Sequence, residues 1–155
     1  MQVHLNADAP SGVSAGALVV PFFSESPLDG VAKDVDAALG GAIADAVASG
    51  EVRGKVGDVI LAYAKDQSYR RVLAVSLGDR TSFEPYLLVR YAGSAIRYLG
   101  RRNVASIAIA LPPQAKGREA ECAAFLAEGA ITGSFETTIY QERPERRLAA
   151  GSGVQ

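Results

Sequence analysis

Short runs of apolar residues, rich in Val, Ile, Leu and Ala, recur along the chain at residues 17–23, 59–64, 72–77 and 104–111. Polar residues do not alternate within these runs, which is typical of strands that are covered on both faces of a sheet. A weaker run at residues 3–6 predicts another strand near the start of the chain. The pattern therefore predicts a buried sheet.

Between the strands, the apolar residues recur with a helical period. A stripe over residues 28–50 predicts a helix that Gly50 ends, with Asp29 in its first turn and Ser26-Pro27 as its start. A second helix is predicted over residues 82–99, and a third over residues 117–133. Thr81 and Glu84 have the spacing of a capping box before the second helix.

The order of these elements is strand, helix, strand, strand, helix, strand, helix. It predicts a three-layer α/β/α domain with a mixed, mostly parallel sheet. The connection between the strands at 59–64 and 72–77 is too short for a helical crossover. Those two strands are therefore expected either to form a hairpin or not to be neighbours.

Two adjacent glycines, Gly40 and Gly41, interrupt the first helical pattern. Each costs about 1 kcal/mol relative to Ala inside a helix, so we expect a break or strong bend near them, with Leu39 and Ile43 still buried. Glycines before a helix can also let a backbone approach phosphate, which makes Gly40 and Gly41 weak candidates for a phosphate loop. We interpret the pair as structural.

Composition limits the kinds of protein this can be. The 155 residues include 16 basic and 17 acidic side chains, with a net charge of −1, so nucleic-acid binding is not expected. No apolar run is long enough to span a membrane, the N-terminus does not resemble a signal peptide, and one cysteine cannot form an internal disulfide. We expect a cytoplasmic protein. We predict one domain over residues 1–137, and a linker or connection over residues 138–155.

Candidate catalytic and metal-binding residues are few. Nucleophilic catalysis by Cys122 would need a base, and the single histidine is His4. We interpret His4 as a surface or edge-strand residue and Cys122 as an inert, buried thiol. Four aspartates share the first helical stretch but scatter around its polar side, so we interpret them as solvated charges rather than a metal site: Asp29, Asp34, Asp36 and Asp45.

Two other features suggest binding. The loop at residues 77–83 follows a strand and leads to a helix, a position where α/β proteins often bind ligands. The second feature is a set of seven arginines. Four lie at the ends of predicted elements. The other three are interleaved with Glu142 and Glu145 in the tail, which weakens their positive field. The seven are Arg70, Arg71, Arg101, Arg102, Arg143, Arg146 and Arg147.

Several stretches together resemble the amino-terminal domain of the leucyl (cytosol) aminopeptidases. The similarity covers about residues 1–140, and its most specific parts are "DAALGG" at 36–41, "GEVRGKVGD" at 50–58 and "RVLAVSLG" at 71–78, in the expected order. One departure is Ser76, where the family more often has Gly. The resemblance implies a macro-domain-like fold that precedes a separate catalytic domain.

In that family, as the resemblance implies, the catalytic domain holds two divalent metals, Zn or Mn, and removes amino-terminal residues from peptides. Its metal and catalytic residues lie in carboxy-terminal motifs that have no match here, so no catalytic or metal-binding residue is carried over. Members are commonly hexamers.

The resemblance predicts that this chain is a non-catalytic accessory domain for assembly and substrate access. The alternative is a macro-like module that binds a nucleotide, ADP-ribose or DNA. The strand end "VVPFFSES" lacks the asparagine that helps to hold ADP-ribose in binding macro domains, which favours the first interpretation.

Overall fold

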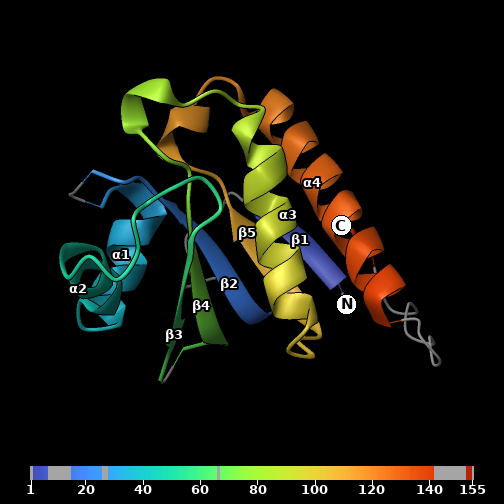
Figure 1. Cartoon of the computed structure of the whole chain (residues 1–155), viewed down its shortest axis with the longest axis horizontal. Coiled ribbons are helices and arrows are strands. Elements are labelled where there is room, and N and C mark those ends of the chain that lie inside the picture. The colour runs from blue at the N-terminus through green and yellow to red at the C-terminus, as the bar shows by residue number, and fades with distance from the viewer. Residues whose placement is uncertain (1, 7–14, 26–27, 66, 142–152, 155) are drawn as a thin grey trace.

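A computed structural model describes residues 2–6, 15–25, 28–65, 67–141 and 153–154. Its strands form one sheet in the order β3-β4-β2-β5-β1-β6 (Figure 1). The strands are β1 (Gln2–Asn6), β2 (Ala15–Phe22), β3 (Val59–Tyr63), β4 (Tyr69–Ser76), β5 (Ser106–Ala110) and β6 (Gly153–Val154). All neighbours are parallel except β3 and β4, which form the antiparallel hairpin that the short connection allowed.

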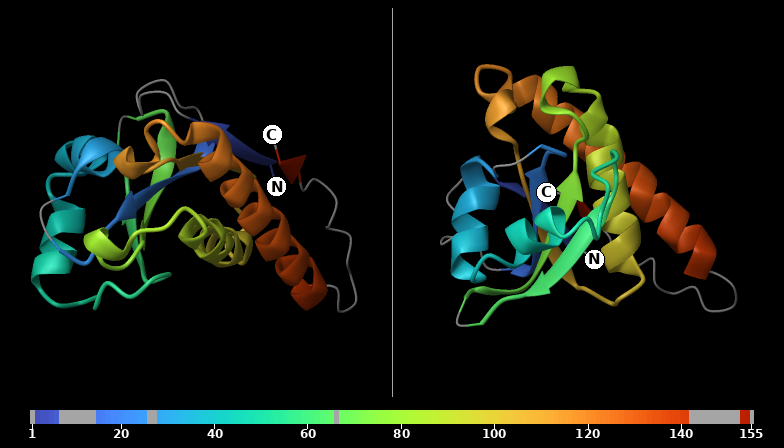
Figure 2. Two further views of the ribbon diagram at one scale, coloured as in Figure 1. Left: turned by 90° about the horizontal axis from the view of Figure 1, so that it is seen from above. Right: turned by 60° about the vertical axis from the view of Figure 1, so that its left-hand side comes forward.

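Helices cover both faces of the sheet, which confirms the three-layer prediction (Figure 2). The helices α1 (Gly30–Ala38) and α2 (Ala42–Ala48) pack on one face, and α3 (Leu87–Gly100) and α4 (Glu119–Gln141) pack on the other. Two short 3-10 turns, η2 (Arg80–Ser82) and η3 (Pro113–Ala115), precede α3 and α4.

Side chains of the apolar strands contribute to two separate hydrophobic cores, one on each face of the sheet. On β2, Ala17 and Val19 face the α3/α4 side, whereas Leu18, Val20 and Phe22 face the α1/α2 side. All five side chains are at most 1% exposed. Because both faces of β2 are covered, its sequence has no polar alternation.

Helix starts differ from the predictions. The helix α1 begins at Gly30 rather than at residue 28, and Ser26-Pro27 lies outside the described residues. The helix α3 begins at Leu87 rather than at Ser82, with Tyr86 as its N-cap, so the predicted capping box of Thr81 and Glu84 is wrong. Pro85 explains this start, because a proline disfavours the helical conformation in the residue before it.

The last helix is longer than predicted. It begins at Glu119 rather than at Gly117 and continues past Gly133 to Gln141. Gly133 lies inside this helix, where it packs against the backbone of Gly93 in α3. The helix crosses the boundary predicted at residue 137, and Gly153–Val154 pairs with β1. None of the helices described in the structure is long and apolar enough to cross a bilayer.

Candidate functional site

The glycine pair breaks the first helical stretch, as predicted. The helix α1 ends at Ala38, and α2 begins at Ala42. Gly40 and Gly41 adopt φ angles of 71° and 87°, and an added Cβ at either would meet nothing within 4 Å. The turn therefore needs glycine for its left-handed backbone and not for space. Ile43 is fully buried as expected, but Leu39 is half-buried.

The free N–H groups at the start of α2 are satisfied by Asp36. Its Oδ1 accepts hydrogen bonds from the backbone N of Ile43 at 2.7 Å and of Ala44 at 3.4 Å. The residue is 7% exposed, so its interpretation as a solvated charge is wrong. A phosphate at Gly40 and Gly41 would need these same donors. The chain's own carboxylate holds them instead.

The loops after β2 and β4 meet in a polar cluster. We call Ser24, Glu25, Asp29, Asp79 and Arg80 the strand-end cluster. Arg80 forms an ion pair with Asp29, and its backbone N donates to Glu25 Oε1 at 2.9 Å. Ser24 Oγ donates to Asp79 Oδ1 at 2.9 Å. The predicted ligand loop at residues 77–83 is thus tied to the end of β2.

The charges of this cluster do not favour a phosphate. The cluster contains three carboxylates but one guanidinium, which pairs with Asp29 and lies 4.8 Å from the centre of the Phe23 ring. The hydrogen bond from the backbone N of Arg80 lowers the pKa of Glu25. Of the four aspartates, Asp34 and Asp45 are exposed as predicted, but Asp29 is half-buried in its ion pair.

Ser76 anchors a second loop at the same edge. Its buried hydroxyl donates to the carbonyl oxygen of Gly54 at 2.8 Å and accepts from the backbone N of Gly78 at 3.0 Å. Gly54 lies so close to the loop after β2 that an added Cβ would be 2.7 Å from Ser24 Cβ. The residue that departs from the family pattern therefore binds the loop at 50–58 over the strand ends. No local pattern of residues indicated this bridge.

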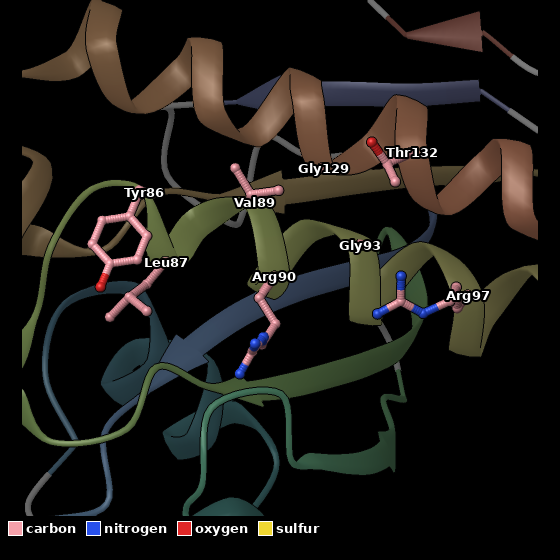
Figure 3. A pocket seen from close by; sticks show the side chains of 8 residues that line it. All are labelled: Tyr86, Leu87, Val89, Arg90, Gly93, Arg97, Gly129 and Thr132. Carbon is pink, nitrogen blue, oxygen red and sulfur yellow. The ribbon is translucent and has the colours of Figure 1, made fainter.

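A groove lies on the other side of the molecule, between α3 and α4 (Figure 3). Its volume is about 480 Å³, within the range of small-molecule sites. Arg90 and Arg97 lie on the same face of α3, about two turns apart, and none of the described lining residues is acidic. They are Tyr86, Leu87, Val89, Arg90, Gly93, Arg97, Gly129 and Thr132. Its charge suits an anionic group.

The other residues considered for catalysis or binding are His4, Cys122 and Arg102. His4 lies on β1, between β5 and β6, so it is not in an edge strand. Cys122 is fully buried, as predicted, and burial raises the pKa of its thiol, which disfavours the reactive thiolate. Arg102 donates to the carbonyl oxygen of Tyr98 at 2.9 Å, as expected near a helix C-terminus. Among the described residues, no group of three or more His, Cys, Asp or Glu could hold a metal ion.

The other basic residues divide between the surface and the tail. Arg70 and Arg101 are exposed, and the guanidinium of Arg71 lies 5.9 Å from the centre of the Tyr63 ring. Glu142 and Glu145, with the three tail arginines that they separate, lie outside the described residues.

Comparison with known proteins places these features in context. Residues 19–144 match the model of the cytosol aminopeptidase family, N-terminal domain. A probable cytosol aminopeptidase of Solibacter usitatus is 32% identical over 148 residues, which are 95% of this chain and 28% of that protein. The chain therefore spans about a quarter of that relative's length.

Solved structures share the fold. A tomato leucine aminopeptidase superposes with a TM-score of 0.72 over 99% of this chain and 32% of its own, at 16% identity. The macrodomain of Thermus aquaticus DarG superposes with a TM-score of 0.63 over 98% and 95%, at 14% identity. At this identity the likeness concerns the fold.

Proposed function

The chain belongs to the cytosol aminopeptidase family, whose N-terminal domain it matches, and from this premise we propose that it is a non-catalytic accessory domain. Its role is to support assembly and substrate access for a catalytic domain that removes amino-terminal residues from peptides. That domain would hold two divalent metals, Zn or Mn, and the whole protein would form a hexamer. We propose a cytoplasmic location, in keeping with the names of the relatives.

This proposal rests on the polar groups at the strand ends, whose hydrogen bonds are made within the chain. At the edge where a parallel sheet usually binds ligands, the polar groups of the strand-end cluster bond to one another, and Asp36 holds the donors beside Gly40 and Gly41. Two-metal hydrolysis also needs a cluster of oxygen ligands that holds two metal ions about 3.5–4 Å apart. The described residues offer no such cluster.

Catalysis by this chain is tested directly. The purified chain is assayed on leucyl-amide and leucyl-peptide substrates with excess Mn²⁺ or Zn²⁺, beside a mock purification. We expect no turnover above the mock. Turnover that disappears on substitution of a carboxylate in this chain would overturn the non-catalytic assignment.

The accessory role is tested by exchange. In the Solibacter usitatus relative, the N-terminal domain is deleted or replaced by this chain, and both proteins are compared with the parent by light scattering and peptide kinetics. We expect the deletion to lose the parent's assembly or raise its KM, and the replacement to restore it at least in part. A deletion that kept both the parent's mass and its KM would refute the role.

The α3/α4 groove is where the alternative function, a binding module for a nucleotide, can be tested. The described lining includes the exposed Arg90 and no acidic residue, in contrast to the strand-end cluster. Calorimetric titration with ADP-ribose and with pyrophosphate tests it, with Arg90→Ala as the variant. We expect weak or no binding. Micromolar binding that Arg90→Ala abolishes would favour the module.

The DNA alternative has a separate test. The near-zero net charge predicts weak binding at physiological salt. Gel shifts at low and moderate salt measure it. Tight binding that persists at moderate salt would contradict the prediction.

A further inference from the structure

The strand β3 forms one edge of the sheet and has a composition that is unusual for an edge. Its sequence, Val-Ile-Leu-Ala-Tyr over Val59–Tyr63, contains no charge, proline or glycine. Natural edge strands are commonly protected by a charged side chain, a proline or a bulge, because unpaired backbone groups recruit other strands. The described register of β3 with β4 is continuous over Val59–Tyr63. A bulge precedes it, where Gly57 N donates to Ser76 O and Ser76 N donates to Asp58 O. This edge therefore has none of the usual protection within the described strand.

The hydrogen bonds to β4 show which backbone groups face outward. Ser76 N donates to Asp58 O, and Ala64 N donates to Arg70 O, both at 2.8 Å. In an antiparallel ladder, hydrogen-bonded pairs alternate, so positions 58, 60, 62 and 64 face β4. The N–H and C=O groups of Val59, Leu61 and Tyr63 point away from the sheet.

The side chains at these three positions share one face. Val59 and Leu61 are partly buried against the α3/α4 core, whereas Tyr63 is 67% exposed. The guanidinium of Arg71, on the neighbouring strand, lies 5.9 Å from the centre of the Tyr63 ring. Of these three side chains, the Tyr63 ring is therefore the one that is mostly exposed to solvent.

We propose that β3 pairs antiparallel with β3 of a second copy of this chain, around a two-fold axis at Leu61. The outward groups are symmetric about that residue, so Leu61 meets its own copy and Val59 meets Tyr63. Three pairs result, and each exchanges two hydrogen bonds. The two sheets become one continuous sheet across the axis.

Charge and packing favour a second copy as the occupant. The strand has no charge to place opposite itself, and Val59 of one copy covers the exposed Tyr63 ring of the other, a favourable aromatic and β-branched pair. Asp58 precedes the strand and the exposed Lys65 follows it. With the two-fold axis at Leu61, antiparallel pairing places Asp58 beyond the end of the three pairs and opposite Ala64, so that no like charges oppose each other within them.

This inference deepens the assembly role proposed above but is tested on the chain alone, so that its failure leaves the catalytic and exchange tests unaffected. Light scattering and sedimentation over a range of concentrations measure the mass. We expect a dimer with twice the 16.2 kDa of the chain. A monomer at all concentrations up to about 1 mM would overturn the proposal, because this corresponds to a binding free energy weaker than about 4 kcal/mol.

Tyr63→Pro breaks the pairing specifically. It removes an outward N–H and the exposed ring but no hydrogen bond to β4, and an edge strand tolerates proline at such a position. We expect at least a tenfold weaker dimer, with the same circular dichroism as the parent. Ile131→Thr is the control, because Ile131 is similarly exposed, at 58%, and lies in α4, away from this edge. A dimer that survived Tyr63→Pro unchanged would refute pairing through β3.

Disulfide trapping tests the register. In the double variant Val59→Cys with Tyr63→Cys, the two new thiols face each other across the axis about 5.5 Å apart at Cα, within disulfide range. Within one chain they are four residues apart on a strand, about 13 Å, and cannot bond. We expect a covalent dimer from the double variant under mild oxidation and none from Tyr63→Cys alone. Equal trapping by the single variant would exclude this register.

Discussion

The two helix pairs of this protein both depend on glycine, but for opposite reasons. Between α1 and α2, Gly40 and Gly41 turn the chain through left-handed conformations in open space. Between α3 and α4, Gly129 is helical, and an added Cβ would lie 2.2 Å from the carbonyl oxygen of Val89. One pair needs glycine's freedom of backbone, and the other needs its lack of a side chain.

The contrast extends to function. At the turn between α1 and α2, the Asp36 carboxylate already accepts from the backbone N of Ile43 at the start of α2. The close contact of α3 and α4 leaves a groove at their surface, with Gly93 and Gly129 in its lining. Arg97 Nη1 lies only 3.2 Å from where a Cβ of Gly93 would be, so this glycine also makes room for the guanidinium. Glycines that resemble one another in the sequence thus have different consequences.

The largest effect is expected for Gly129→Ala. The new methyl group would collide with backbone that cannot move without separating α3 from α4, so we expect a loss of about 3 kcal/mol or more in the free energy of unfolding. Gly133→Ala should cost less, because the nearest atom is 2.9 Å away, and Gly93→Ala least, because its nearest atom belongs to the flexible Arg97 side chain. Urea unfolding measures the series. An equal effect at all three positions would contradict the steric explanation.

A smaller effect is expected for Gly41→Ala. A non-glycine residue in the left-handed region costs about 1–2 kcal/mol. Gly41→Asn is the matched comparison, because asparagine tolerates this region and should recover much of the loss. If Asn and Ala destabilised the protein equally, the space around residue 41, rather than its backbone angle, would be responsible.

Removal of the cap on α2 should cost about 1 kcal/mol. Asp36→Ala leaves the backbone N–H groups of Ile43 and Ala44 without their acceptor. Asp36→Asn keeps an oxygen acceptor and should be milder. Thermal and urea unfolding compare the two variants, with the exposed Asp34→Ala as the control. No loss in Asp36→Ala would show that water replaces the carboxylate at this site.

The smallest effect concerns the start of α4. The Glu119 carboxylate accepts from the backbone N of Gly117 at 3.0 Å, which lowers the pKa of Glu119 in the folded protein. A lowered carboxyl pKa contributes stability above the unfolded value, about 4.3, that is lost as pH falls through the folded pKa. Glu119→Gln should therefore differ from the parent at pH 6 and converge with it as the pH falls below about 4. Glu128→Gln, an exposed acid in the same helix, is the control, and an identical pH profile for both variants would refute the effect.

Much of the fold could be predicted from the sequence, because a strand that is buried on both faces is apolar at successive positions. The runs that became β2, β4 and β5 are apolar at successive positions, and the short connection before β4 permits a hairpin. The break at Gly40 and Gly41 was also predictable, because the backbone cost of glycine is a local property. Helix starts were less so: Pro85 outweighed a capping pattern that began four residues earlier.

The site was predictable only in its position, at the strand ends. The local pattern of Asp36 is that of a solvated helical charge, yet its carboxylate caps the next helix seven residues on. Ser76 looks like a neutral substitution in a strand, yet it bonds to Gly54, 22 residues earlier. Each depends on a partner that the chain brings close only after it has turned.

By itself, the sequence determined the strands, the glycine break, the mixed sheet and membership of the family, because these depend on local composition and on order along the chain. Only the tertiary structure decided which glycines are needed because a side chain would not fit, and which carboxylates are buried. It also decided that the polar groups at the strand ends bond to one another and that β3 lies at an edge of the sheet. These properties belong to pairs of residues that are distant in sequence. Their energies arise from contact, direction and exclusion of water, which no single stretch of the chain encodes.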